Sequence, residues 1–163
     1  MGKQTFIKVL KVPPGLIKVM FTEDLVLRVT LRSYGDYTQS VTESAPEPGF
    51  FLLLRRYLKG EVVDLGSIPV SYERLPYRYI KVYEYMREHL LYGTTTTYGQ
   101  LANILNIHPR KVGLILSKNP IPILVPCHRV LAKGGLGGYS SGLRWKKFLL
   151  TLEGILKDIG SLD

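Results

Sequence analysis

The 163-residue chain contains a single cysteine, three histidines and no long apolar run. One cysteine, Cys127, excludes an intrachain disulfide and a thiolate-rich structural zinc site, and we predict neither a metal nor a cofactor. No apolar run reaches the roughly 18–20 residues of a membrane helix. Lysines interrupt the first twenty residues, where a signal peptide requires an unbroken apolar stretch. We therefore expect a cytoplasmic protein with no membrane partner.

Acidic residues are missing from one long stretch, from His89 to Leu152, which contains eight Lys or Arg. The net charge is +2 over residues 1–70 and +7 over residues 71–163. A solvated surface normally mixes both signs. The stretch therefore favours a surface that faces a polyanion such as nucleic acid. A basic surface without a partner is the alternative.

The first part of the chain has the pattern of a small sheet with one helix. Three β-branched and aromatic segments predict an antiparallel meander: 4–12, 16–21 and 25–33. Apolar residues at helical spacing over 50–58 predict a helix that ends near Gly60. Residues 61–75 resemble an extended linker. We predict the fold class α+β, with an N-terminal domain over 1–70 packed on a mainly helical C-terminal domain over 71–163.

The second part has helical periodicity. Residues 77–91 predict an amphipathic helix. Thr97 and Gln100 match a capping box, in which the hydroxyl caps the helix and the amide reaches back, for a helix over 98–105. A proline stands at the first position of a further helix over 109–118. Two short helices joined by a tight turn are helix-turn-helix geometry.

The second of these helices opens with two basic residues, Arg110 and Lys111. Many protein cores contain two helices and a tight turn, so the pattern alone is a weak indication of DNA binding. The absence of acidic residues from both helices strengthens it, because a helix presented to a nucleic-acid groove meets phosphates.

Cys127 follows a proline-rich segment over 120–126 that cannot form a regular helix. His128 and Arg129 come next in the sequence. An imidazole and a guanidinium lower the pKa of a nearby thiol, and the thiolate is the nucleophile. The spacing therefore predicts a reactive cysteine with a lowered pKa. In the alternative interpretation, His128 and Arg129 are neighbours that point elsewhere.

These residues resemble a known family. The sequence Pro-Cys-His-Arg-Val over 126–130, with Asn-Pro at 119–120 before it and Gly-Gly-Tyr-Ser at 137–140 after it, resembles the active-site signature of the O6-alkylguanine-DNA alkyltransferases. The resemblance runs from about Pro76 to Gly154. It implies a DNA repair protein that flips out an O6-alkylguanine and irreversibly takes the alkyl group in one turnover.

The resemblance also implies a role for each matching residue. Cys127 would be the alkyl acceptor, and His128 would take its proton through a water. Glu153 would orient the histidine and balance its charge. Asn119 would hold the turn before the active-site segment, and Tyr98 would donate to the guanine that leaves.

Further matching residues would contact the substrate or the DNA. The predicted substrate-binding residues are Tyr139, Ser140, Ser141, Lys146 and Val130. The predicted DNA-binding residues are Arg110, Lys111, Gly113, Ser117, Thr97, Gln100 and Arg129. In this family the second helix enters the minor groove of double-stranded DNA, and Arg110 would fill the gap left by the flipped base. Ser141 stands where many relatives have glycine, which predicts a tighter pocket. We expect a monomer.

Two other classes compete with this function. A non-catalytic lesion sensor would bind damaged DNA without chemistry, but relatives of that kind replace the reactive cysteine. A cysteine hydrolase that uses Cys127 and His128 would need neither the paired helices nor the acid-free stretch.

Overall fold

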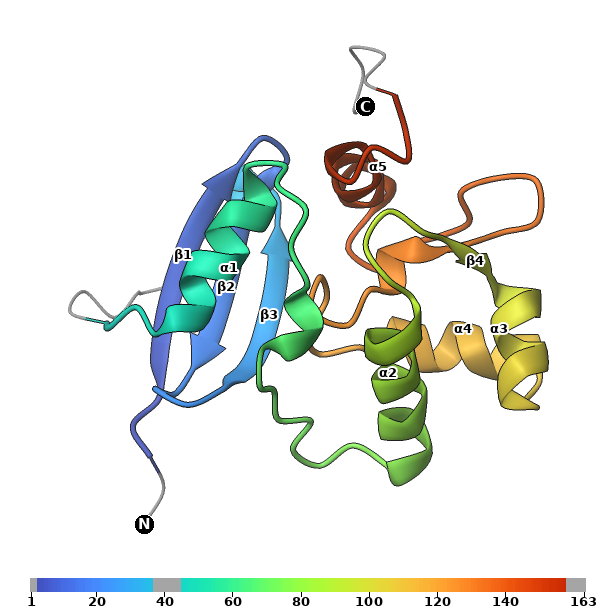
Figure 1. The fold of residues 1–163 in the computed structure, drawn as a ribbon, viewed down its shortest axis with the longest axis horizontal. Coiled ribbons are helices and arrows are strands. Elements are labelled where there is room, and N and C mark those ends of the chain that lie inside the picture. Colours follow the sequence, from blue (N-terminus) through green and yellow to red (C-terminus); the bar gives the residue numbers. More distant parts are fainter. Residues whose placement is uncertain (1–2, 37–44, 158–163) are drawn as a thin grey trace.

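The computed structural model describes residues 3–36 and 45–157. The chain begins with an antiparallel sheet of order β1-β2-β3, followed by one helix (Figure 1). The bounds are β1 Phe6–Val12, β2 Gly15–Phe21, β3 Val26–Arg32 and α1 Gly49–Leu58. The predicted meander, the predicted helix and the α+β class are confirmed.

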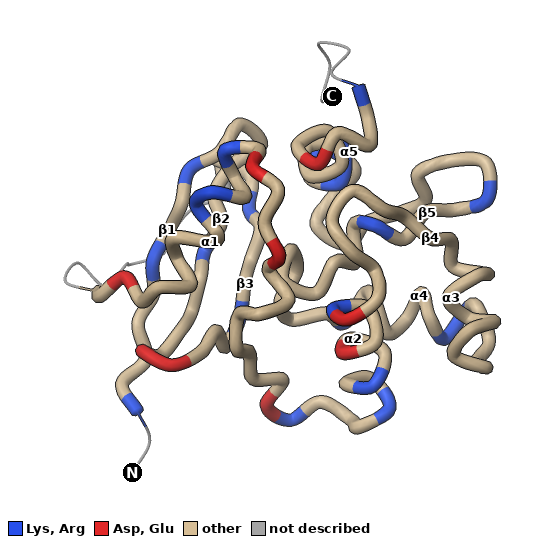
Figure 2. The backbone as a smooth tube through the Cα atoms, in the orientation of Figure 1, with Lys and Arg blue, Asp and Glu red and all other residues tan. Residues whose placement is uncertain are grey.

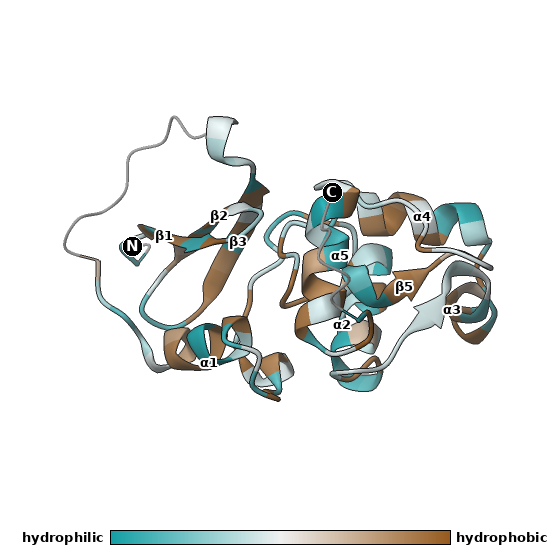
Figure 3. Cartoon of the chain, turned by 90° about the horizontal axis from the view of Figure 1, so that it is seen from above, coloured by the Kyte–Doolittle hydropathy of each residue, from teal (hydrophilic) through white to brown (hydrophobic). Residues whose placement is uncertain are grey.

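Helix α1 covers one face of the sheet (Figures 1 and 3). Its buried side chains are Phe51, Leu54 and Tyr57, which recur at the spacing of one helical face. The Phe51 ring meets the Phe21 ring of β2 edge-on, with centroids 4.8 Å apart. The helix ends at Leu58, near Gly60 as predicted, and the φ of 89° at Gly60 suits a residue without a Cβ.

The remaining elements form a second, mainly helical group. They are α2 Tyr77–His89, β4 Thr96–Thr97, α3 Tyr98–Leu105, α4 Pro109–Ser117, β5 Val130–Leu131 and α5 Leu143–Leu152. The predicted helices are confirmed, and so is the capping box of Thr97 and Gln100. The short parallel pair β4–β5 was not predicted, because two-residue strands carry no periodicity.

The edge of β3 joins the two groups through backbone hydrogen bonds. Val26 exchanges bonds with the segment after α1, donating to the Pro69 carbonyl at 2.9 Å and accepting from the Ser71 N–H at 2.9 Å. Val29 donates to the Pro120 carbonyl at 3.0 Å. The segment predicted as a linker is therefore fixed to the sheet in part, and so is the start of the cysteine segment. A domain boundary near residue 70 stays a prediction.

Within the part of the chain that the structure describes, no helix is both long and apolar enough to cross a membrane.

Candidate active site

Cys127 is held by the turn that follows α4. The Asn119 side chain accepts from the Ile121 N–H at 2.9 Å, and its Nδ2 donates to the Val125 carbonyl at 3.2 Å and to the Cys127 sulfur at 3.1 Å. Ile123 lies in this turn with a φ of 76°, a conformation that β-branched residues rarely adopt. The backbone is thus bent so that one amide side chain contacts both the turn and the thiol.

The thiol opens into a pocket of about 240 Å³ between α3, α4 and the loop before α5. The lining residues are Tyr98, Gly113, Leu116, Ser117, Cys127, Gly138, Tyr139 and Ser140. The Cys127 sulfur lies 3.5 Å from the Tyr139 hydroxyl oxygen. The structure therefore brings six of the predicted site residues to one pocket, although they come from four separate segments of the chain.

The pKa of Cys127 differs from the prediction. Burial raises the pKa of the thiol above its usual value, despite opposing effects of the Tyr139 and Asn119 hydrogen bonds and the Lys146 charge. The expectation of a lowered pKa was wrong because burial has the largest effect on the thiol, and because the His128 ring and the Arg129 guanidinium are directed at Glu153. The resting cysteine is consequently a thiol that needs a base.

His128 is fully buried and pairs with the carboxylate of Glu153. Its Nε2 lies 2.6 Å from a Glu153 carboxylate oxygen, so Nε2 carries the proton and Nδ1 is the free acceptor of the neutral ring. Nδ1 is buried without a hydrogen-bond partner among the described residues. Burial lowers the pKa of His128, although Glu153 opposes this effect. The imidazole is therefore neutral near pH 7 and able to accept a proton.

Glu153 is surrounded by donors. The Arg129 guanidinium contacts both carboxylate oxygens, at 2.8 and 3.0 Å. The Tyr57 hydroxyl donates to Glu153 at 2.6 Å, and the Gly93 N–H donates at 3.1 Å. Burial alone would raise the pKa of this carboxyl, but the hydrogen bond with His128, the hydrogen bonds from Arg129 and the Arg129 charge hold it well below its usual range. Glu153 is therefore a carboxylate at any physiological pH.

Sequence analysis missed Tyr57 and Gly93 as members of this network. Tyr57 lies 96 positions before Glu153, and its place on the apolar face of α1 is that of an ordinary core residue. A buried tyrosine needs a partner for its hydroxyl, but the sequence does not show where that partner lies.

Lys146 is also fully buried, on α5. Its ammonium donates to the Val130 carbonyl at 2.7 Å and to the Gly138 carbonyl at 3.0 Å. It lies 5.9 Å from the ring centroids of both Tyr98 and Tyr139. Burial lowers its pKa to about 8. The lysine thus keeps its charge at neutral pH and fixes the pocket wall.

Two residues that were predicted to contact DNA or substrate are buried instead. Arg129, predicted to bind DNA, is buried, and its remaining nitrogen donates to the Leu90 carbonyl at 2.7 Å. Val130, predicted to bind substrate, is fully buried within β5. Both positions argue against a direct contact with DNA or substrate, because the guanidinium is used by Glu153 and the Val130 carbonyl by Lys146.

The other predicted contact residues lie at or near the surface. The exposed ones are Arg110, Lys111, Ser117, Gln100 and Ser140, and the half-buried ones are Thr97, Gly113 and Ser141. Figure 2 shows blue basic positions along α4 and the loop before α5, and no red position between α2 and the end of α5. The chain segments that line the pocket therefore contain no Asp or Glu.

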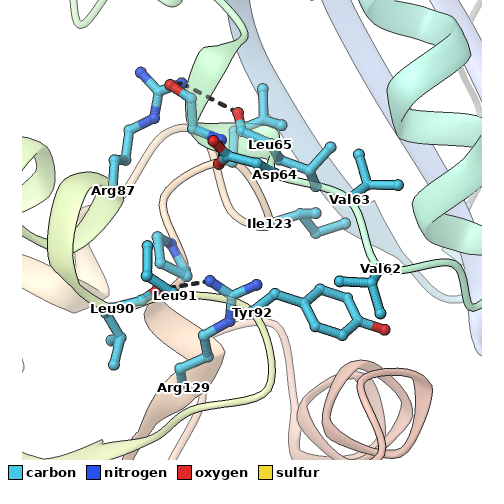
Figure 4. Close-up of a pocket in the computed structure, with 13 residues that line it drawn as sticks. Val62, Val63, Asp64, Leu65, Arg87, Leu90, Leu91, Tyr92, Ile123 and Arg129 are labelled. Atoms are coloured by element: carbon cyan, nitrogen blue, oxygen red, sulfur yellow. Dashed lines mark hydrogen bonds between the residues drawn. The ribbon is translucent and has the colours of Figure 1, made fainter.

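A second cavity of about 240 Å³ is lined by Arg129 but not by Cys127 (Figure 4). Arg87 lines it and donates to the carbonyls of Leu65, Gly66 and Ile68. Among the described residues, no group of three His, Cys, Asp or Glu is placed to hold a metal ion.

Several known proteins are similar to this chain in sequence and fold. A family model described as the DNA-binding domain of 6-O-methylguanine DNA methyltransferase matches residues 78–155. The matched range contains the pocket, Cys127, His128 and Glu153. The fold and the site therefore define a class of DNA methyltransferases.

The relatives narrow this class. The chain is 42% identical over 137 residues to a methylated-DNA–protein-cysteine methyltransferase of Methanopyrus kandleri, covering 80% of this chain and 97% of the relative. The O6-methylguanine-DNA methyltransferase of Pyrococcus kodakaraensis has a TM-score of 0.71 at 29% identity, over 93% of this chain and 99% of that one. The Mycobacterium tuberculosis OGT in complex with DNA has a TM-score of 0.73 at 28% identity, over 90% and 91%. The chain belongs to the methylated-DNA–protein-cysteine methyltransferase family.

Proposed function

We propose that this chain repairs DNA by transferring an alkyl group from O6 of guanine to Cys127 in a single turnover. The observation that carries the proposal is the position of the Cys127 thiol. Asn119 holds it at a pocket of about 240 Å³, and the next residue in the chain, His128, forms a buried pair with Glu153. The product is a thioether, and its C–S bond is not broken by attack of water or of a carboxylate, because the thiolate is a poor leaving group. The protein is therefore consumed in the reaction.

The first step removes the thiol proton. Because burial raises the pKa of Cys127, solvent at neutral pH leaves it protonated. The neutral His128 ring accepts this proton at Nδ1 through a water, and Glu153 stabilises the imidazolium that forms. This is the logic of a catalytic triad with a water inserted between nucleophile and base.

The second step is an in-line displacement. The Cys127 sulfur attacks the alkyl carbon, the S–C bond forms and the C–O6 bond breaks. The electron pair stays on guanine, whose developing charge accepts a hydrogen bond from the Tyr98 hydroxyl in the pocket wall, and the guanine anion takes up a proton from water once it leaves the pocket. The Lys146 ammonium, held behind the rings of Tyr98 and Tyr139, stabilises this charge.

The target base reaches the pocket only when it leaves the duplex. Arg110 is exposed at the start of α4 and would fill the gap in the base stack. The neighbouring exposed residues, Lys111 and Ser117, would contact phosphates. We infer that α4 enters the minor groove and that binding depends little on base sequence.

Intact-protein mass spectrometry tests the proposal. The chain is incubated with DNA containing O6-methylguanine, with the Cys127→Ala variant as a control. A gain of one methyl group per protein on Cys127, absent from the control, is the expected result. Unchanged mass with retained binding to the lesion would replace the proposal by the lesion-sensor alternative.

A further inference from the structure

A cleft of about 450 Å³ lies between β3, the turn before α2 and the end of α4. Three basic residues line it, and each comes from a different segment: Arg28 from β3, Arg74 from the turn and Lys118 after α4. Glu73 is the one acidic residue in the lining. We refer to this feature as the basic cleft.

The three basic side chains are exposed. None of them forms an ion pair with any residue in the described ranges. Three cations facing one cleft repel one another, and the single carboxylate of Glu73 cannot neutralise them all. The basic cleft therefore presents a positive potential that favours an anionic partner.

The walls of the basic cleft are fixed to one another. Backbone bonds from β3 lie on either side of Arg28: Val26 pairs with the segment before Arg74, and Val29 bonds to the Pro120 carbonyl at 3.0 Å, two residues after Lys118. The three cations are thus carried on a common framework. A partner does not have to order these segments before it binds.

The basic cleft lies next to the active-site pocket, because Ser117 at the end of α4 lines both. The exposed residues of α4 form one stripe at helical spacing that ends at the cleft: Arg110, Lys111, Leu114, Ser117 and Lys118. A DNA strand that follows this stripe with one nucleotide in the pocket reaches the cleft next.

We propose that the basic cleft binds the sugar-phosphate backbone of the DNA strand that flanks the flipped nucleotide. The inference rests on the proposed function and extends DNA binding to the sheet, where the sequence gives no indication of it. Arg28 and Arg74 would each neutralise phosphate charge, and Glu73 would weaken the contact.

The salt dependence of binding tests this proposal. Fluorescence anisotropy gives the Kd for a duplex containing O6-methylguanine over a series of salt concentrations. Each lost phosphate contact lowers the slope of log K against log salt by about 0.9. For the double variant Arg28→Ala/Arg74→Ala we expect the slope to fall by about 2. Glu73→Gln should tighten binding.

The matched control is Lys11→Ala/Arg32→Ala, which removes the same charge from exposed positions of β1 and β3 outside the cleft. Its slope should equal that of the wild type. A double Arg28/Arg74 variant whose slope matches this control overturns the proposal.

Alkyl transfer from a free O6-alkylguanine base, which has no phosphate, separates the two proposals. Wild-type protein and the Arg28→Ala/Arg74→Ala variant should react with it at equal rates. If neither reacts with the free base or with DNA containing O6-methylguanine, the proposed function fails, while a reduced salt slope would still support the cleft as a DNA contact.

Discussion

At the scale of single residues, the Glu153 carboxylate is shared by side chains from separate parts of the chain. Tyr57 and His128 donate to the same carboxylate oxygen, each at 2.6 Å. Any change at one of these donors alters the charge that the carboxylate offers to the other. We therefore expect Tyr57 to position His128 for the proposed proton transfer, although it lies outside the pocket.

Replacing Tyr57 with Phe should raise the pKa of His128. The carboxylate loses one donor and interacts more strongly with the imidazolium, so the acid limb of the alkyl-transfer rate should move to higher pH. The variant should also lose about 1.5–3 kcal/mol of stability, typical of a hydrogen bond to a charged group. Single-turnover rates over a pH series measure the shift.

Tyr83→Phe is the control for this variant. Tyr83 is equally buried, and its hydroxyl donates to the Ile115 carbonyl at 2.5 Å, away from Glu153. It should lose stability without moving the acid limb. Identical pH profiles for the two variants would show that Tyr57 has only a structural role.

The pH profile of the wild type follows from His128 and Lys146. The pKa of His128 lies below 6.5, so the base remains neutral as the pH falls past that value. The pKa of Lys146 is about 8, so its charge is lost above that pH. With a free O6-alkylguanine base as substrate, we expect a plateau that ends near pH 8 and a decline above it. A rate that rises steadily above pH 8 would indicate that solvent, not His128, deprotonates the thiol.

At the scale of elements, α4 has a buried face and an exposed face. Val112, Ile115 and Leu116 are buried and fix the helix to the core. The exposed face begins with Arg110 and ends at Lys118, between the pocket and the basic cleft. The helix can therefore be altered on its outer face without loss of the fold.

Arg110→Ala tests the outer face. Extrusion of a base costs a few kcal/mol, and loss of the residue that fills the stack should slow alkyl transfer from duplex DNA about tenfold. Transfer from the free base should not change. The neighbouring variant Lys111→Ala should weaken binding but leave the rate at saturating duplex unaltered. Equal rates for both variants at saturation would contradict the role of Arg110.

At the scale of the whole molecule, the proposed reaction would change the packing around Cys127. The Cys127 residue is only 6% exposed, and its sulfur contacts Asn119 and Tyr139. An added methyl group replaces the thiol hydrogen, so the sulfur no longer donates to the Tyr139 hydroxyl, and a buried polar group that loses its partner typically costs about 1–3 kcal/mol.

We therefore expect the methylated protein to melt several degrees below the free form, at about 2–4 °C for each kcal/mol. Differential scanning calorimetry before and after reaction measures the shift, with Cys127→Ala given the same treatment as a control. Equal melting temperatures for the two wild-type forms would sink this prediction.

Acid should also destabilise the molecule. Glu153 has a lowered pKa in the folded state, so its contribution is present above its usual pKa of 4.5 and is lost as the pH falls. His128 also has a lowered pKa, so the unfolded chain takes up a proton below about 6.5 before the folded chain does. Urea unfolding over a pH series should show a free energy of unfolding that falls below pH 6.5. A free energy independent of pH between 6.5 and 4.5 would contradict the buried neutral histidine.

The sequence alone was enough for most local features of this protein. Periodicity, the capping box and the turn residues predicted the sheet and the helices, because these depend on neighbours a few positions apart. Six lining residues of the pocket were also named in advance, through the motif around Cys127. The roles of the individual site residues remain predictions.

Only the tertiary structure decided how charges are paired. Adjacency in sequence placed His128 and Arg129 beside the thiol, but the fold directs both at Glu153, and burial then raises the pKa of Cys127. Burial and long-range contacts are set by the packing of segments far apart in the chain. For the same reason, the Tyr57 bond and the basic cleft at Arg28 could be found only in three dimensions.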